Sequence, residues 1–187
     1  MAGNKTRILV ESGLTIALAY VLGRIVVYKM PMGGSVSLEM VPIMVFALRR
    51  GAVPGVVAGA LYGLLNYTID PVPPVHWVQF FVDYPLAHGL VGLAGLGAAA
   101  WRRVKTGSRL RGVLAVVVPF ALLAAGARFG AHFLSGVVFF GAYAPAGQPV
   151  WLYSLVYNAS YMVPSALVCA AATAAVLPGL ERAVPAR

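Results

Sequence analysis

Charged residues are scarce in this sequence, and acidic ones are scarcest. The 187 residues include 5 Asp and Glu against 14 Lys and Arg, and 10% of the chain is charged whereas 60% is apolar. The mean hydropathy is +0.85. A soluble domain has roughly 25% charged and about 45–50% apolar residues, and a disordered chain is poor in apolar residues. The composition therefore excludes both classes and predicts an integral membrane protein.

The sequence also lacks the motifs of several enzyme classes. It contains no G-x-x-x-x-G-K-[ST], so this chain is not expected to hydrolyse ATP in the P-loop manner. It has no H-E-x-x-H and only 3 scattered His, which predicts no metal site. The one cysteine, Cys169, lies in an apolar run and is expected to be a small buried side chain. We therefore expect neither enzymatic activity nor a bound cofactor.

Six apolar stretches are candidates for transmembrane helices, because a span needs about 20 apolar residues. The second and third stretches are short for a full crossing. We predict an all-α integral membrane protein with six transmembrane helices, forming a single domain over residues 1–187. The predicted helices cover residues 8–28, 37–48, 52–67, 77–101, 112–140 and 150–180.

The basic residues predict the orientation of these helices. If the N-terminus is cytoplasmic, six spans return the C-terminus to the cytoplasm, and eleven of the 14 Lys and Arg fall in cytoplasmic segments. Cytoplasmic loops of membrane proteins carry such an excess of basic residues. Both termini are therefore predicted to lie in the cytoplasm.

Three polar residues on three different predicted helices lie at similar depth. At 1.5 Å per residue, Asp83 lies about 9 Å below the outer end of its helix, and His132 and Asn158 lie about 12 Å below theirs. Polar side chains within a membrane are costly and are candidates for a functional site. Their common depth predicts a pocket, open to the outside, for a polar ligand, and an aromatic one is favoured.

The presence of each of these polar residues also has a purely structural explanation. Asp83 could form a structural salt bridge with Arg128, and His132 could simply bond a neighbouring helix. Glu39 could be favoured only by the positive end of the helix that starts after it. One stripe of the fourth predicted helix contains His76, Gln79, Asp83 and Ala87; His88 lies off this polar stripe and is expected to have no function. An intramembrane enzyme with Asp83 and His132 as acid and base remains an alternative.

Five segments of the chain match a known family. They are GGSVSLEMVPI, ALRRG, QFFVDYPLA, RFGAHFLSGVVFF and LYSLVYNASY, and their order and spacing cover nearly the whole sequence. On these segments the chain resembles the thiamine-specific substrate-binding subunits, or S components, of bacterial energy-coupling-factor transporters (the ThiT or YuaJ family). The resemblance implies a multi-pass protein of the bacterial plasma membrane that captures thiamine with high affinity for ATP-driven uptake.

The resemblance also implies which residues bind the ligand. Thiamine is expected beneath the loop of residues 29–37, and its thiazolium and aminopyrimidine suit a carboxylate and an amide. Some family members have Trp where this chain has Ser35 and Phe140, which weakens the expected ring stacking unless Tyr28 or another ring substitutes. The candidate ligand-binding residues are Ser35, Glu39, Asp83, Tyr84, His132, Gly136, Phe140, Tyr153 and Asn158.

The same resemblance implies partner proteins. These are a transmembrane coupling subunit and two cytoplasmic ATPases, in a membrane of lipid and without nucleic acid. Gly13 and Ala17 form a small-xxx-small pattern that would let the coupling subunit approach the first helix closely, although packing within this chain is the alternative. An S component for another vitamin, or for a pyrimidine precursor of thiamine, is the nearest alternative function.

Overall fold

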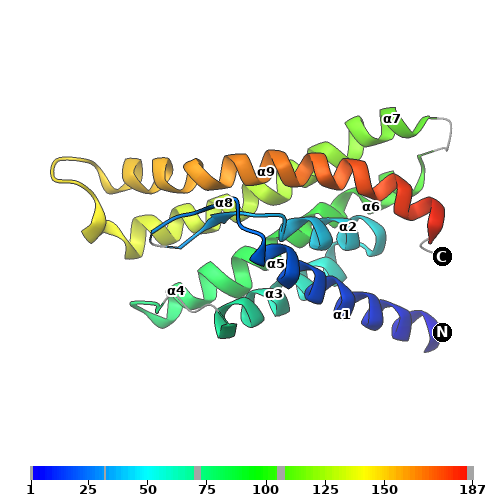
Figure 1. The fold of residues 1–187 in the computed structure, drawn as a ribbon, viewed down its shortest axis with the longest axis horizontal. Helices are drawn as coiled ribbons and strands as arrows, with labels where there is room; N and C mark the ends of the chain where they lie inside the picture. The colour runs from blue at the N-terminus through cyan, green and yellow to red at the C-terminus, as the bar shows by residue number, and fades with distance from the viewer. Residues whose placement is uncertain (1, 32, 70–72, 105–107, 185–187) are drawn as a thin grey trace.

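The computed structural model describes residues 2–31, 33–69, 73–104 and 108–184, and these form six helical segments (Figure 1). Four segments are long and apolar enough to cross a membrane: Lys5–Arg24, Trp77–Arg102, Arg109–Phe139 and Val150–Ala183. The all-α membrane fold is thereby confirmed. The first three segments are α1 (Ala2–Arg24), α2 (Met40–Arg50) and α3 (Ala52–Ile69). The fourth segment consists of α4 (Trp77–Phe81), η1 (Val82–Leu86), α5 (Ala87–Leu90), η2 (Val91–Gly97) and α6 (Ala98–Arg102), and the fifth consists of α7 (Arg109–Gly112), η4 (Val113–Val117) and α8 (Val118–Phe139). The short turn η5 (Gly141–Tyr143) connects the fifth segment to the sixth, α9 (Val150–Ala183).

Helix α2 forms the centre of the bundle. Its first ten residues, from Met40 to Arg49, are all buried. At 1.5 Å per residue, its 11 residues extend about 16 Å, roughly half the thickness of the hydrocarbon core. Large side chains of α2 pack with residues of the fourth, fifth and sixth segments, so α2 is an internal helix that its neighbours enclose. Members of this core include Met40, Ile43, Met44, Leu48, Val91, Val117 and Leu177.

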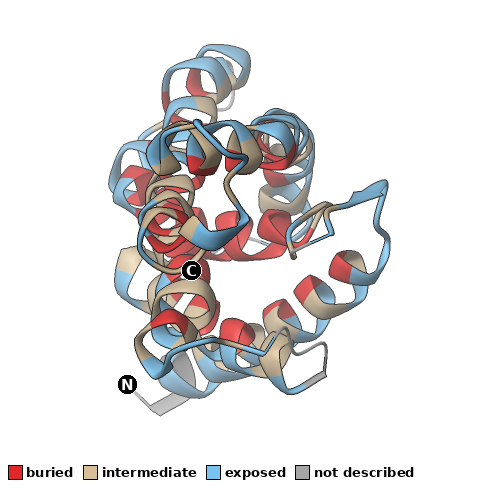
Figure 2. Cartoon of the chain, turned by 90° about the vertical axis from the view of Figure 1, so that its left-hand side faces the viewer, coloured by how far each residue is buried: buried red, intermediate tan, exposed pale blue. Residues whose placement is uncertain are grey.

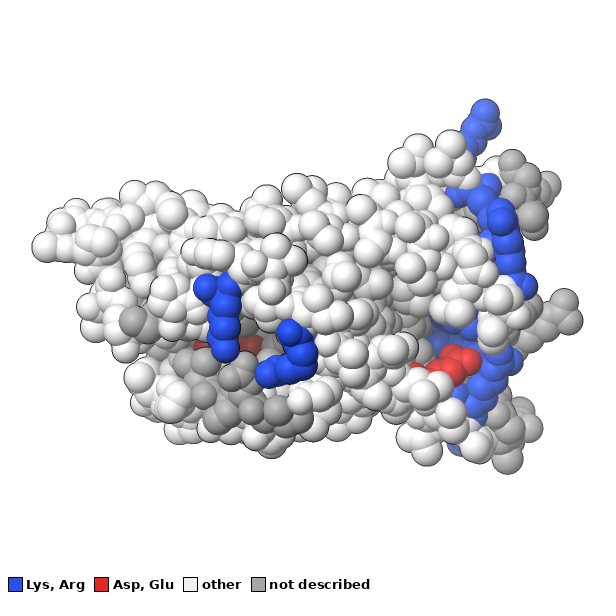
Figure 3. All heavy atoms as spheres, viewed as in Figure 1, with Lys and Arg blue, Asp and Glu red and all other residues white. Residues whose placement is uncertain are grey.

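The helical segments turn their buried residues toward one another and their exposed residues outward, as Figure 2 shows along the long axis. Helix α1 exposes Leu9, Leu14 and Leu18, as expected of a surface that faces lipid or another membrane protein. The two termini lie at the same end of the molecule (Figure 1). Most of the Lys and Arg side chains visible in Figure 3 gather at that end, in agreement with the predicted cytoplasmic cluster.

The fourth segment departs from regular α-helix around Pro85. Proline has no N–H, and its ring would collide with the carbonyl four residues earlier in a regular helix. The wider π turn η1, Val82–Leu86, accommodates Pro85. Glycines of α3 face this region: a Cβ at Gly63 would overlap the carbonyl oxygen of Tyr84, and one at Gly59 that of His88. The backbones of α3 and the fourth segment are therefore in direct contact.

The first helix ends earlier than predicted. Helix α1 ends at Arg24, whereas the sequence predicted residue 28, because the chain beyond it forms a hairpin of β1 (Tyr28–Lys29) and β2 (Ser35–Val36). The turn contains Gly33 and Gly34 at φ of 89° and 91°, which glycine adopts without strain. The hydroxyl of Tyr157 on α9 donates a hydrogen bond to the Gly33 carbonyl (3.1 Å). The predicted loop over the ligand is therefore a hairpin held against α9.

Candidate ligand-binding site

A cavity of about 330 Å³ lies under the hairpin, between the helices. Acidic atoms are visible in a recess between two basic side chains on the left half of the face in Figure 3. The three residues at similar predicted depth, Asp83, His132 and Asn158, all line this cavity, so their convergence is confirmed. Their role in binding remains a prediction. All nine candidate residues line it: Ser35, Glu39, Asp83, Tyr84, His132, Gly136, Phe140, Tyr153 and Asn158.

Asp83 projects from the widened turn η1 and meets two side chains of α8. Its Oδ1 lies 3.2 Å from Nδ1 of His132, and its Oδ2 accepts a hydrogen bond from the Ser135 hydroxyl at 2.8 Å. A carboxylate has about four lone-pair sites, so these two contacts leave acceptor capacity for a ligand. The carboxylate is thus fixed in orientation by α8 and is still able to accept further hydrogen bonds.

Glu39 lies just before α2 and is buried. Its Oε1 lies 2.6 Å from Nη2 of Arg128, and its Oε2 accepts a hydrogen bond from the Tyr62 hydroxyl at 2.7 Å. Its side chain makes no capping hydrogen bond to the helix. Arg128 therefore pairs with Glu39, and the predicted alternative of an Asp83–Arg128 salt bridge is wrong. The cause is the fold, which brings the start of α2 against α8.

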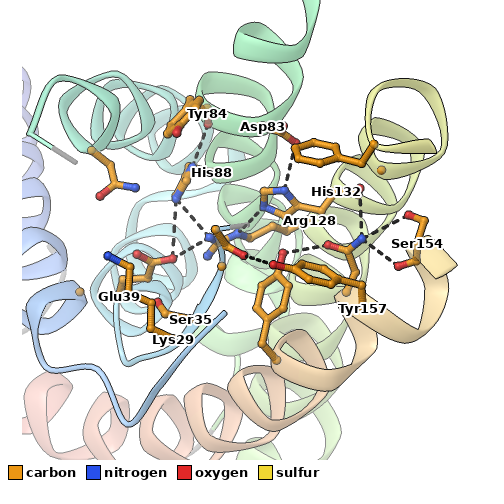
Figure 4. A pocket seen from close by; sticks show the side chains of 18 of the residues that line it. Lys29, Ser35, Glu39, Asp83, Tyr84, His88, Arg128, His132, Ser154 and Tyr157 are labelled. Carbon is orange, nitrogen blue, oxygen red and sulfur yellow. Dashed lines mark hydrogen bonds and ion pairs between the residues drawn. The ribbon is translucent and has the colours of Figure 1, made fainter. Parts of the chain in front are cut away.

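Two histidines flank Arg128 (Figure 4). Nη2 of Arg128 lies 3.2 Å from Nε2 of His88, and Nε of Arg128 lies 3.4 Å from Nε2 of His132. Nδ1 of His88 lies 2.9 Å from the Tyr84 carbonyl oxygen. His88 is buried and lines the cavity although it lies off the predicted stripe, and its lack of function stays a prediction.

Helix α9 forms the opposite wall. The Asn158 amide donates to the Ser154 carbonyl at 2.9 Å, and its Oδ1 accepts a hydrogen bond from the Tyr161 hydroxyl at 2.9 Å. A Cβ at Gly136 of α8 would collide with the Ser154 hydroxyl, so only glycine allows this close packing. The amide of Asn158 is therefore held in one orientation beside the cavity.

Aromatic rings complete the walls. Tyr84 packs edge-on against Tyr67, with ring centroids 4.9 Å apart, and Tyr153 lies 5.9 Å from Tyr157. Tyr28 is exposed on β1 and is not among the lining residues, so it does not substitute for a ring at Ser35. Besides Phe140, the cavity is lined by tyrosine rings of the fourth segment and α9: Tyr84, Tyr153, Tyr157 and Tyr161.

Comparison with known proteins identifies the family. Residues 9–183 match the family model described as "Thiamine transporter protein (Thia_YuaJ)". The chain belongs to the thiamine transporter family. It is 41% identical over 165 residues to the thiamine transporter ThiT of Bacillus subtilis (strain 168), which covers 87% of this chain and 85% of that protein. It is 37% identical over 122 residues to ThiT of Lacticaseibacillus paracasei, covering 64% of this chain and 61% of that protein.

A solved structure of the same family has the same fold. ThiT from Listeria monocytogenes superimposes with a TM-score of 0.82 at 28% sequence identity, covering 97% of this chain and 96% of that one. The resemblance seen in the five sequence segments is therefore confirmed. Membership of a thiamine transporter family also confirms the prediction of a multi-pass membrane protein.

Sequence reasoning about this thiamine transporter family member missed two buried residues, Tyr62 and His88. The predicted stripe on the fourth segment ran from His76 through Gln79 and Asp83 to Ala87, at regular helical spacing. The π turn at Val82–Leu86 inserts one extra residue and rotates the helix beyond it, so His88 joins Ala87 on the buried side. Pro85 was the one visible signal of this rotation. The spacing of residues along α3 gives no signal that distinguishes Tyr62 from its neighbours.

Proposed function

We propose that this chain binds thiamine and acts as the substrate-binding subunit of an energy-coupling-factor importer. The observation that carries the proposal is the Asp83 carboxylate, oriented by His132 and Ser135 within a cavity of about 330 Å³, in a chain whose relatives are named thiamine transporters. A carboxylate can attract the thiazolium cation or accept from the aminopyrimidine amine, and Asn158 offers a donor and an acceptor.

The contacts of Asp83, rather than the total charge of the lining, which also includes Arg24 and Lys29, support a cationic ligand. Arg128 and Glu39 form a buried pair and offset each other. Asp83, by contrast, contacts an imidazole and a hydroxyl, neither of which carries the fixed positive charge of an arginine. Its negative charge is therefore available to the ligand, and a site of this volume with apolar walls and a few placed polar groups is typical of small-molecule binding.

Docking of a coupling subunit on α1 is also part of the proposal. Gly13 and Ala17 are both exposed, and no atom lies within 4 Å of a Cβ built at Gly13. The open space at Gly13 supports contact with an external partner. It gives no support at Gly13 to the alternative, in which the small residues pack within this chain. Because the sequence has no P-loop, the energy for transport would come from partner ATPases.

Titration of the purified, detergent-solubilised protein with thiamine tests the proposed ligand. We expect saturable binding, followed by intrinsic fluorescence or heat, that is lost in His132→Ala and Asn158→Ala. Gly179→Ala is a matched control, because no atom lies within 4 Å of its built Cβ. A folded protein that ignores thiamine but binds another vitamin or a pyrimidine would overturn the assigned ligand. Turnover of the ligand, lost in Asp83→Asn, would indicate an enzyme instead.

A further inference from the structure

We infer that Arg128 is a positioning residue that fixes His88 and His132 as their Nδ1–H tautomers and so directs a hydrogen bond from His132 to Asp83. The inference rests on the proposed function only in assigning Asp83 to the ligand. Its physical basis is the hydrogen-bond chemistry of one buried guanidinium and the two imidazoles beside it.

A guanidinium has N–H donors and no acceptor, and it stays charged in proteins. Nε of Arg128 faces Nε2 of His132 at 3.4 Å, and Nη2 faces Nε2 of His88 at 3.2 Å. Nε2 of His132 must therefore present a lone pair, because an N–H there would place two donors face to face. Nε2 of His88 also lies 3.7 Å from Oε1 of Glu39, and its shorter contact with Arg128, at 3.2 Å, favours a lone pair there as well.

The proton of each neutral imidazole is then on Nδ1. Nδ1 of His132 lies 3.2 Å from the Asp83 carboxylate, and Nδ1 of His88 lies 2.9 Å from the Tyr84 carbonyl oxygen. Both of these partners are acceptors. The four contacts are thus satisfied together by one pair of tautomers. The opposite tautomer of His132 would place two donors face to face at Arg128 and two acceptors face to face at Asp83, whereas the opposite tautomer of His88 would exchange its Arg128 contact for the longer one to Glu39.

Arg128 is itself held in place by two other helices. Glu39, before α2, contacts its Nη2 at 2.6 Å, and the Tyr62 hydroxyl of α3 donates to the other oxygen of Glu39 at 2.7 Å. Tyr62 is fully buried and packs edge-on against the His88 ring, with centroids 5.1 Å apart. A continuous set of contacts therefore runs from Tyr62 through Glu39, Arg128 and His132 to Asp83, and Figure 4 shows the part between Glu39 and Asp83.

The consequence for the ligand lies at Asp83. With His132 donating from Nδ1, the Asp83 carboxylate accepts a hydrogen bond at Oδ1. The Ser135 hydroxyl engages the other oxygen at 2.8 Å, so the carboxylate cannot rotate freely. A cation or an amine that enters the cavity then meets an oriented carboxylate, and this preorganisation avoids an ordering cost on binding.

Nitrogen-15 NMR of the ligand-free protein, labelled at histidine, tests the tautomers directly. The chain has 3 His, and His76 serves as the internal reference because its Nδ1 accepts a hydrogen bond from the Val78 N–H at 3.1 Å. We expect the neutral His76 to carry its proton on Nε2 and the other two to carry theirs on Nδ1. A neutral His132 with its proton on Nε2, or an imidazolium at neutral pH, would overturn the inference.

A double variant, Glu39→Gln with Arg128→Met, removes the donor without leaving a buried unpaired charge. We expect both tautomers of His88 and His132 to become populated and thiamine to bind about tenfold more weakly. Ser135→Ala is the matched control: it removes the other donor to Asp83, so binding weakens while both tautomers stay unchanged. Unchanged tautomers in the folded double variant would assign Arg128 a purely structural role.

The two proposals fail in distinguishable ways. The NMR measurement needs no ligand, so it holds or fails whether or not thiamine binds. Arg128→Lys adds a rescue test, because an ammonium is also a donor without an acceptor. We expect it to restore part of the Nδ1–H population relative to the double variant, and an Nε2–H population equal to that of the double variant would contradict a donor role.

Discussion

Among the Arg–Glu pairs that join helices in the described residues, two differ clearly in their surroundings: one lies beside the cavity, and the other lies nearer the end that carries both termini. Arg128 and Glu39 are 2.6 Å apart, and both residues are buried. Arg50 of α2 donates two hydrogen bonds of 2.6 Å to the Glu11 carboxylate of α1, whose side chain is 22% exposed. The second pair has the better bidentate geometry, and the first has the drier surroundings.

The neighbours of each pair differ more than the pairs themselves. Arg128 also contacts His88 and His132, so it reaches two imidazoles that line the cavity. Glu11 also accepts from Arg7 of its own helix at 3.2 Å, so this pair sits in a basic cluster and fastens α1 to α2. The further residues that contact each ion pair therefore distinguish the two: histidines of the cavity contact the first pair, and a neighbouring arginine of α1 contacts the second.

The largest expected effect breaks the buried pair. Glu39→Ala leaves Arg128 as an uncompensated buried charge, which costs about 3–5 kcal/mol of unfolding free energy. The measurement is denaturant or thermal unfolding in detergent. Glu11→Ala, at the partly exposed pair, is expected to cost about 0–1 kcal/mol. Equal losses for the two variants would contradict the distinction drawn from burial.

The next effect concerns the ligand. Asp83→Asn keeps the shape of the side chain and removes its charge, so we expect thiamine to bind about 10- to 100-fold more weakly, or about 1.5–3 kcal/mol for a hydrogen bond to a charged group. Isothermal titration measures the affinity. Glu11→Gln is the control, since it removes a carboxylate that does not line the cavity. Unaltered affinity in Asp83→Asn would show that the ligand does not use this carboxylate.

A smaller effect sharpens the comparison at a contact without charge. Gly63→Ala places a methyl group against the Tyr84 carbonyl, and such overpacking costs about 1–3 kcal/mol. We expect a lower unfolding temperature and weaker thiamine binding, because Tyr84 is next to Asp83 in the same turn. Gly179→Ala, in open space, should leave both quantities within error. A neutral Gly63→Ala would mean that α3 and the fourth segment separate easily.

The smallest effect is expected at the partly exposed pair. Glu11→Gln should lower stability by about 0–1 kcal/mol, and the difference from the unmodified protein should shrink at high salt because exposed ion pairs are screened. Unfolding at two salt concentrations measures this. Thiamine affinity should not change. A loss that is large and independent of salt would place Glu11 in a drier environment than its exposure indicates.

Much of the fold is predictable from hydrophobic runs that the sequence displays. All six predicted stretches correspond to helical segments. The depth of Asp83, His132 and Asn158 along their helices was enough to predict that they line one cavity. The early end of α1 could not be predicted from hydropathy. Residues beyond Arg24 are as apolar as those before it, and only the pairing of Tyr28 with Val36 shows that the chain is extended there.

The parts of the site that could not be predicted depend on contacts between distant segments. The partner of Arg128 is Glu39, 89 positions earlier in the chain, and no periodicity within one helix relates the two. His88 reaches the cavity because a π turn shifts its register, and helical spacing assumes that no such turn exists. Local patterns predict which face a residue occupies, whereas the choice of partner is a property of the assembled bundle.

The enclosed position of α2 has a consequence for biosynthesis. A helix that is long and apolar enough can settle in lipid as soon as it leaves the ribosome, but α2 spans only about half the hydrocarbon core. Its stabilising contacts come partly from α9, where Thr173 donates to the Met44 sulfur at 3.7 Å and Glu181 lies 3.3 Å from Arg49. Helix α9 follows α2 in the chain, so the second helix reaches its final environment only after the sixth segment has been synthesised.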